Sequence, residues 1–329
     1  MRRIAFSLTV WLCSAVLLHA QEAQVKLPVI GWLSPSTTQA YQQTGLGKPG
    51  PQLLRETLAK FGLIDGKNVR LEMRLAEGRL ERFPGLAEAL VRDGATVILA
   101  FGEPAGQAAQ TATATIPIVC VADDLVGSGL AASLARPGSN MTGVSILATE
   151  LDAKKIELLK ELLPDAKRFG VINDPATSGG ERLQKIDRTA RHLGIEIQTI
   201  DVHGPDDLEP AFKALRAGRA EGVNIVSSSM FTGLRQRLGE LSLTAKIPAI
   251  CQWRNMVEAG CLASYGITTE ELYSLSADQV AKLLKGATPA DLPVQQPTKF
   301  ELVINLKSAK ALGVIIPSSF LLRADEVIE

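Results

Sequence analysis

Short apolar runs alternate with segments of helical spacing along most of the chain. Runs of four to seven apolar residues are typical of buried strands, and the segments between them repeat apolar residues every three or four positions. This alternation predicts βα units and parallel sheets. The expected strands are 27–33, 69–73, 96–101, 116–121, 142–146, 168–172, 196–200, 222–226, 249–251, 261–264 and 301–304. The expected helices are 52–61, 80–92, 104–113, 151–163, 180–193, 208–217, 233–245, 268–284 and 306–312.

These units form two sets of similar size, which suggests two doubly wound domains in tandem with a connection near 135–140. A chain of 329 residues is long enough for two lobes of about 100 to 200 residues each. After the helix at 268–284, the spaced prolines Pro289, Pro293 and Pro297 predict an extended segment on the surface.

The first twenty residues have the features of an export leader. Arg2 and Arg3 precede an uncharged apolar stretch, 4–18, and Ala20 is a small residue suited to cleavage. The stretch is too short and wrongly flanked for a membrane span, and Cys13 lies inside it, where a lipid anchor would not form. We expect cleavage after Ala20 and a mature chain in the periplasm that does not itself span a membrane.

The charge balance gives little reason to expect a polyanionic partner. Without the leader the chain has 33 basic and 35 acidic residues, and it has no basic stripe that could follow a row of phosphates. Nucleic acid is therefore excluded as an expected partner.

The mature chain keeps three cysteines, Cys120, Cys251 and Cys261. Cys251 ends one expected strand and Cys261 begins the next. If these strands are parallel neighbours, the two residues lie at opposite ends of the sheet, beyond the ~7 Å Cα separation that a disulfide allows. We expect all three to be packing residues. No CxxC pair or Cys/His cluster indicates a metal site.

Small polar residues follow many of the expected strands. In open parallel sheets a ligand binds outside the carboxyl ends of the strands, and the helices that begin there favour anionic groups at their first turn. In any single loop a hydroxyl could equally be a helix cap, so the prediction depends on several loops converging. The expected ligand-binding residues are Ser34, Ser36, Thr37, Tyr41, Gly102, Glu103, Pro104, Asp123, Asp124, Asn173, Asp174, Ser227, Ser228, Trp253 and Tyr265.

Two kinds of side chain in this set have distinct expected roles. Tyr41, Trp253 and Tyr265 could stack on a ligand ring or apolar chain, although Trp253 could equally anchor a lobe edge. Glu103 would face the cleft at a helix N-terminus.

Catalytic groups are scarce. His192 falls in a helical pattern and His203 in a turn, and neither is placed as a general base. The chain has no GxSxG, HExxH or GxxxxGK[ST] motif. We expect a binding protein without a cofactor, not an enzyme.

Several motifs resemble a known family along nearly the whole mature chain. They are 133–145 (SLARPGSNMTGVS), 157–160 with Pro164, 258–260, 264–266, 290–313 (ADLPVQQPTKFELVINLKSAKALG), Ile316-Pro317 and 324–328. The set resembles the ABC transporter substrate-binding proteins of the tryptophan/tyrosine-binding type, which have a type I periplasmic binding protein fold. The C-terminal run is the most specific of these motifs.

The resemblance implies two doubly wound parallel-sheet lobes joined by three crossings, which replaces the simple tandem arrangement. By that resemblance the first lobe takes 26–145 plus 266–292 and the second takes 146–265 plus 293–329. The family commonly has Ser or Thr where this chain has Glu103, and Asp-Pro where it has Asp124-Leu125. An acid at Glu103 would repel a ligand carboxylate and favour an amine or hydroxyl.

The resemblance also implies the biological role. We expect a monomeric solute-binding protein that traps a small molecule, an amino acid or aromatic solute, by hinge closure and delivers it to an ABC permease and its ATPase. The alternative is a receptor subunit of the same fold that reports a ligand to a membrane sensor kinase. A cytoplasmic transcription regulator would need a DNA-binding segment before Lys26, where the leader lies, and a hydrolase would show turnover.

Overall fold

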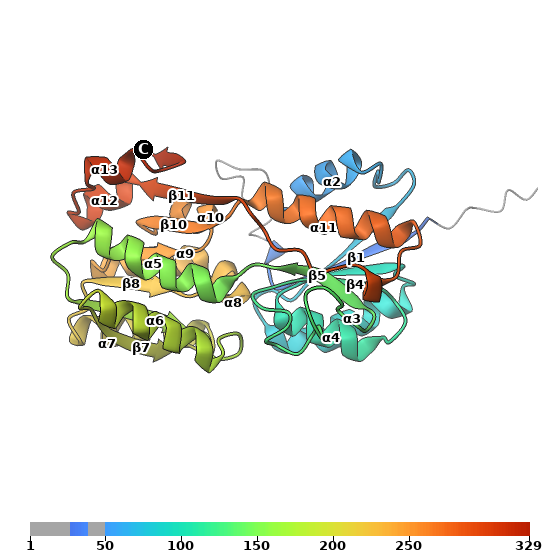
Figure 1. Cartoon of the computed structure of the whole chain (residues 1–329), viewed down its shortest axis with the longest axis horizontal. Coiled ribbons are helices and arrows are strands. Elements are labelled where there is room, and N and C mark those ends of the chain that lie inside the picture. The colour runs from blue at the N-terminus through green and yellow to red at the C-terminus, as the bar shows by residue number, and fades with distance from the viewer. Residues whose placement is uncertain (1–26, 39–49) are drawn as a thin grey trace, which may run out of the picture.

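A computed structural model describes residues 27–38 and 50–329. Two α/β lobes lie side by side in it, with the C-terminus at the upper edge of the second lobe (Figure 1). The expected export leader and Tyr41 lie outside the described residues.

The first lobe contains a five-stranded parallel sheet with strand order β2-β1-β3-β4-β5. Its strands are β1 (Val29–Ser34), β2 (Arg70–Leu75), β3 (Val97–Phe101), β4 (Ile118–Ala122) and β5 (Met141–Ser145). Its helices are α2 (Gly50–Lys60), η1 (Leu80–Arg82), α3 (Phe83–Arg92), α4 (Glu103–Ala112), α11 (Thr269–Leu284) and η3 (Pro289–Asp291). The helices α2 and α11 contribute to one apolar cluster, and α3 and α4 contribute to another. The sheet is therefore covered on both faces.

The second lobe contains a seven-stranded sheet with strand order β12-β11-β10-β9-β8-β6-β7. Its strands are β6 (Arg168–Asn173), β7 (Glu196–Asp201), β8 (Gly222–Ile225), β9 (Ala249–Cys251), β10 (Ala263–Ile267), β11 (Phe300–Asn305) and β12 (Glu326–Ile328). Its helices are α5 (Ala148–Leu162), α6 (Gly180–His192), η2 (Pro205–Asp207), α7 (Leu208–Ala217), α8 (Ser229–Gly233), α9 (Arg235–Ala245), α10 (Arg254–Glu258), α12 (Leu306–Leu312) and α13 (Ser318–Leu321). Strand β11 runs antiparallel to β10, so this sheet is mixed at one edge.

The chain passes between the lobes three times: between β5 and α5, between β10 and α11, and again before β11 (Figure 1). The predicted fold of two doubly wound lobes with three crossings is confirmed. The connection expected near 135–140 is not a crossing, because it leads into β5, which pairs with β4 in the first sheet.

The proline-spaced stretch is less exposed than we expected. Pro289 is buried in the turn η3, and Val294 and Pro297 are also buried. The backbone of Gln295 forms a parallel bridge with Val144 of β5. This stretch therefore extends the edge of the first sheet on its way to the second lobe.

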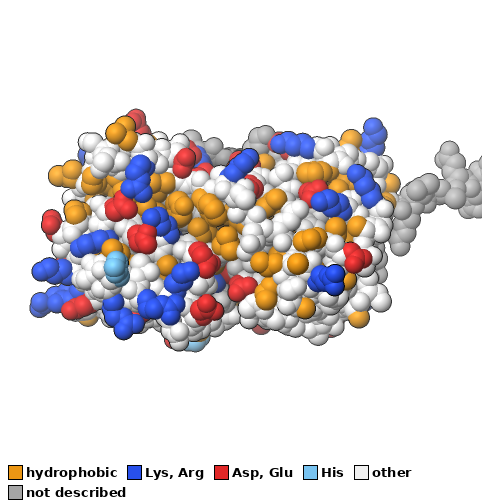
Figure 2. Space-filling model, in the orientation of Figure 1, with side chains coloured by type: hydrophobic (Ala, Val, Ile, Leu, Met, Phe, Trp, Pro, Cys, Tyr) orange, Lys and Arg blue, Asp and Glu red, His pale blue; other side chains and the backbone are white. Residues whose placement is uncertain are grey.

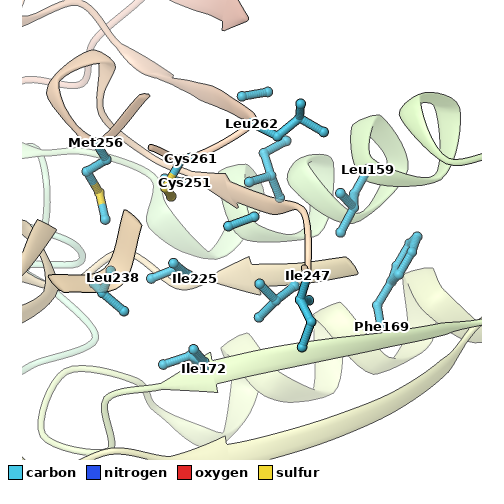
Figure 3. Close-up of a cluster of buried hydrophobic side chains, with 14 of the residues drawn as sticks. Leu159, Phe169, Ile172, Ile225, Leu238, Ile247, Cys251, Met256, Cys261 and Leu262 are labelled. Atoms are coloured by element: carbon cyan, nitrogen blue, oxygen red, sulfur yellow. A yellow bond between two sulfur atoms is a disulfide. The ribbon is translucent and has the colours of Figure 1, made fainter. Parts of the chain in front are cut away.

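The prediction that Cys251 and Cys261 are unbridged is wrong. They form a disulfide with a Cα separation of 6.5 Å, inside the range that disulfides require. Strand β9 is only three residues long, and Cys261 precedes β10 by two residues, so the two cysteines are not held at opposite ends of long strands. Figure 3 shows the bridge within a buried cluster that includes Met256 and Leu238. Cys120 is buried with a free thiol.

Candidate ligand-binding site between the lobes

Polar residues at the carboxyl ends of the two sheets meet where the lobes touch. Asp123 follows β4 in the first lobe, and one of its carboxylate oxygens accepts a hydrogen bond from Arg182 Nη2 of the second lobe at 2.8 Å. The other oxygen accepts from the Ser227 hydroxyl, which follows β8, at 2.7 Å. Both side chains of the Asp123–Arg182 pair are almost fully buried, with 8% and 3% exposed. The predicted residues Asp123 and Ser227 are thus brought together from different lobes.

Arg182 is fixed mainly by its own lobe. Its Nη1 donates to the Ser227 carbonyl oxygen at 2.9 Å and to the Ser178 hydroxyl at 3.4 Å, and it lies 3.7 Å from a carboxylate oxygen of Asp152. Burial would lower the pKa of Arg182, but the Asp123 and Asp152 carboxylates outweigh it and raise that pKa above its ordinary value. The second lobe therefore presents a permanently charged guanidinium to the first.

A buried ion pair, Lys155–Asp152, lies next to Arg182 in the second lobe. Lys155 Nζ lies 2.6 Å from Asp152 and donates to the Ile225 carbonyl oxygen at 2.8 Å, and neither side chain of the pair is exposed. Burial lowers the pKa of Lys155, and the neighbouring Asp152 carboxylate opposes that change. Asp152 also accepts from the Ser227 amide at 3.3 Å. Helix α5 is thereby tied to the end of β8.

Glu103 begins α4 and is partly buried beside Asp123. Its Oε1 accepts from the amides of Asp123 at 2.7 Å and Asp124 at 3.2 Å. Burial, together with the Asp123 carboxylate, raises the pKa of Glu103 to about 8. Near neutral pH this carboxyl group is largely protonated, so it repels a ligand carboxylate less than the sequence suggested.

A second polar group lies at the ends of β6 and β8. The Ser228 hydroxyl caps α8 by accepting from the Met230 amide at 3.1 Å, and it donates to Asp174. Asn173 donates from its side-chain amide to Asp201 of β7 at 2.7 Å. Within 27–38 and 50–329, the Asn173 side-chain oxygen has no hydrogen-bond partner, although it is buried. These residues extend the polar surface along the second sheet.

Other predicted residues have local roles. Asp124 is exposed, and its carboxylate accepts from the Val126 and Gly127 amides of its own turn. The Ser34 hydroxyl accepts from the Ser36 amide at 3.3 Å. Thr37 is partly buried in the same loop.

Two further predicted residues lie at the start of α4. Gly102 caps this helix, and Pro104 occupies its first turn. A Cβ atom on Gly102 would lie 2.7 Å from the Ser229 hydroxyl of the second lobe, and the residue has φ +92°, so both sterics and backbone conformation favour glycine here. The lobes approach each other closely at this point.

Two of the predicted aromatic residues, Trp253 and Tyr265, lie in the described part of the second lobe. Trp253 directly precedes α10 and packs against apolar clusters of both lobes, as an anchor at a lobe edge would. The ring of Tyr265 stacks on Phe300 with a centroid separation of 6.1 Å.

The sequence interpretation missed several residues of this region. Arg182, Asp152 and Lys155 lie on helices, where charged residues usually face solvent, so no local signal marked them as buried. Ser229 and Gln252 directly follow predicted residues or a predicted strand. Their position just after strands could have marked them as candidate binding residues.

One surface pocket lies away from these residues. It has a volume of about 540 Å³ and is lined by Gln110, Ala114, Thr115, Ser139, Asn140, Thr288 and Pro289. Gln110 lies in the last turns of α4, and Thr115 and Asn140 shortly precede β4 and β5, so the pocket is near the amino ends of these strands. Basic and acidic side chains are intermingled on the face drawn in Figure 2. In the described part of the chain, no helix has the length and apolar composition needed to cross a bilayer.

A family model described as ABC transporter substrate binding protein matches residues 51–328. The chain belongs to this family. A protein of this family binds a substrate without converting it, in agreement with our expectation that the chain is not an enzyme. The family prediction made from the motifs is confirmed.

Individual relatives agree with this assignment. A tyrosine-binding protein from Clostridioides difficile is 28% identical over 261 residues, which cover 79% of this chain and 75% of that protein. The crystal structure of a conserved domain protein from Vibrio cholerae has a TM-score of 0.83 and 28% identity, covering 92% of this chain and 100% of that one. An ABC domain in complex with L-Trp from Streptococcus pneumoniae has a TM-score of 0.80 and 25% identity, with the same coverage of 92% and 100%.

Proposed function

We propose that this substrate-binding protein serves an ABC importer and captures an amino acid, most favourably an aromatic one, between its two lobes. The observation that carries the proposal is the meeting of Asp123, Ser227 and Arg182 across the lobe boundary. An α-amino acid has one cationic and one anionic group, and this cluster offers carboxylates and a guanidinium that complement them. The names of the relatives that bind tyrosine or L-Trp support the aromatic class.

The ligand would contact the predicted strand-end residues of both lobes, with Arg182 added to them. We assign the lobes to 26–145 plus 266–292 and to 146–265 plus 293–329, and we infer that they close on the solute by a hinge at the three crossings. The mature protein would act as a monomer in the periplasm after cleavage of its leader at Ala20. It would deliver its ligand to a membrane permease with a cytoplasmic ATPase.

Calorimetric titration of the purified mature chain with single amino acids tests this proposal. Saturable binding of L-Tyr or L-Trp is expected, with a higher melting temperature because ligand binds only the folded form. A control variant, Glu161→Gln, changes an exposed ion pair in the second lobe and should bind like the wild type. Absence of binding to any of the twenty amino acids would refute the proposed ligand class.

A further inference from the structure

Gln252 is a buried amide whose hydrogen-bonding capacity is unused. The residue is 2% exposed and directly follows β9. Neither its Nε2 nor its Oε1 has a hydrogen-bond partner among the residues that the structure describes. A buried polar group without a partner destabilises a protein, so a residue of this kind needs a reason to be retained. A ligand that supplies the missing hydrogen bonds is such a reason.

Gln252 belongs to the row of residues that follow the strands of the second sheet. Residues Asn224 and Ile250 pair between β8 and β9, and Ser264 pairs with Cys251 between β10 and β9. Continuing this register by one or two residues puts Gln252 level with Val226 on one side and Tyr265 on the other. Gln252 therefore lies at the carboxyl edge of the second sheet, as the charged cluster does.

A close backbone contact holds Gln252 next to a crossing. A Cβ atom on Gly266 would collide with the Gln252 carbonyl oxygen and would lie 3.0 Å from its Cγ. Glycine is thus required at position 266 for the backbones of Gly266 and Gln252 to lie this close together. The adjacent Trp253 packs against the cores of both lobes. Gln252 accordingly sits beside the apolar contact that joins the lobes.

The charged Asp123–Arg182 pair and the neutral Gln252 amide lie at different strands along the carboxyl edge of the second sheet. Arg182 and Asp123 meet at Ser227, which follows β8, whereas Gln252 follows the neighbouring strand β9. Adjacent strands lie about 5 Å apart, so the amide and the ion pair are separated by roughly one or two strand spacings. An aromatic amino acid has a similar distance between its charged α-carbon groups and the far edge of its ring. Its charged groups would face the ion pair and its ring would extend toward Trp253 and Gln252.

We propose that Gln252 is a specificity-determining residue that forms hydrogen bonds with the polar atom on the ring of the solute. This inference depends on the proposed function and adds an order of preference to it. A phenolic hydroxyl can donate to Oε1 and accept from Nε2, an indole N–H can only donate to Oε1, and a phenyl ring can do neither. The expected order of affinity is L-Tyr, then L-Trp, then L-Phe, with L-Tyr favoured over L-Phe by roughly 10- to 100-fold.

The test compares the mature wild type with Gln252→Met, which replaces the amide by an apolar side chain of similar shape. Titrations with L-Tyr, L-Trp and L-Phe should show that the variant loses most of the preference for L-Tyr while its affinity for L-Phe is kept. Its ligand-free melting temperature should rise, because two unpaired polar atoms leave a buried site. A residue with a purely structural role would not combine lower affinity for one ligand with higher stability. Gln252→Leu is a second variant if the first does not fold.

Gln279 provides a matched control. It is also buried, and its Oε1 has no hydrogen-bond partner among the described residues, but its Nε2 donates to the Pro293 carbonyl oxygen at 2.9 Å in the stretch that follows η3. Gln279→Met removes one hydrogen bond together with one unpaired oxygen, so its melting temperature should rise less than that of Gln252→Met, and the order of affinities should be unchanged. If the wild type binds these amino acids and Gln252→Met retains the preference for L-Tyr, the inference is overturned. If the wild type binds none of the three, the proposed aromatic ligand class fails and the inference fails with it.

Discussion

The Asp123–Arg182 ion pair should control how readily the lobes close. We consider Asp123→Asn, which removes the charge while keeping the shape of the side chain and an acceptor for the Ser227 hydroxyl. Removing one partner of a buried ion pair costs about 3 to 5 kcal/mol. Arg182 keeps Asp152 at 3.7 Å and the Ser227 carbonyl oxygen at 2.9 Å, so we expect the lower end of that range.

The cost should affect closure more than unfolding, because opening the cleft returns Arg182 to water without disrupting either core. A penalty of about 3 kcal/mol lowers the ratio of closed to open molecules by roughly 100-fold. Ligand affinity should fall by a comparable factor if binding requires the closed form.

Small-angle X-ray scattering measures the closure directly, and titration calorimetry measures the affinity. Without ligand, Asp123→Asn should have a larger radius of gyration than the wild type or should need more ligand to reach the compact value. Glu161→Gln, which removes an exposed charge paired with Arg323, should match the wild type in both measurements. Superimposable scattering curves and unchanged affinity in Asp123→Asn would show that the ion pair does not control closure.

Two further predictions concern acidity and the disulfide. Because the folded-state pKa of Glu103 is raised to about 8 by burial and the Asp123 carboxylate, its stabilisation is complete below pH 4.5 and is lost as the pH rises toward 8. Melting temperatures from pH 5 to 9 should therefore fall more steeply for the wild type than for Glu103→Gln; parallel profiles would contradict the assigned pKa. The Cys251–Cys261 bridge joins residues 10 apart in the sequence. The double variant Cys251→Ser/Cys261→Ser should therefore have a free energy of unfolding about 2 to 3 kcal/mol lower than the wild type, measured by urea denaturation. An unchanged denaturation midpoint would argue against the bridge.

The sequence predicted the regular parts of the fold because long elements carry a clear hydrophobic period. Helices α7 and α12 were predicted with their observed limits, as was the short strand β9, and most other limits differ by one to three residues. Some short elements were missed, among them α10 with five residues and β12 with three, although the equally short β9 was predicted. The stretch expected as one helix at 233–245 belongs to two, because α8 ends at Gly233 before α9 begins.

The site was harder to predict because its members depend on packing between lobes. Asp123 and Ser227 were found by the rule that ligands bind at strand ends, and they do meet. Arg182 and Lys155 are long charged residues on helices, and only the tertiary structure shows that they are buried. The disulfide was rejected by an argument that assumed long strands. A three-residue strand removes that assumption.

The order in which the chain visits the lobes determines when each lobe can fold during synthesis. The first lobe lacks α11 until residue 284 has been made, and Val294 of its other apolar cluster is made later still. The second lobe lacks β11 until residue 305. Neither hydrophobic core can form fully on a nascent chain that has not almost reached its end. In this topology each lobe therefore becomes complete only after both segments that return to it have been made.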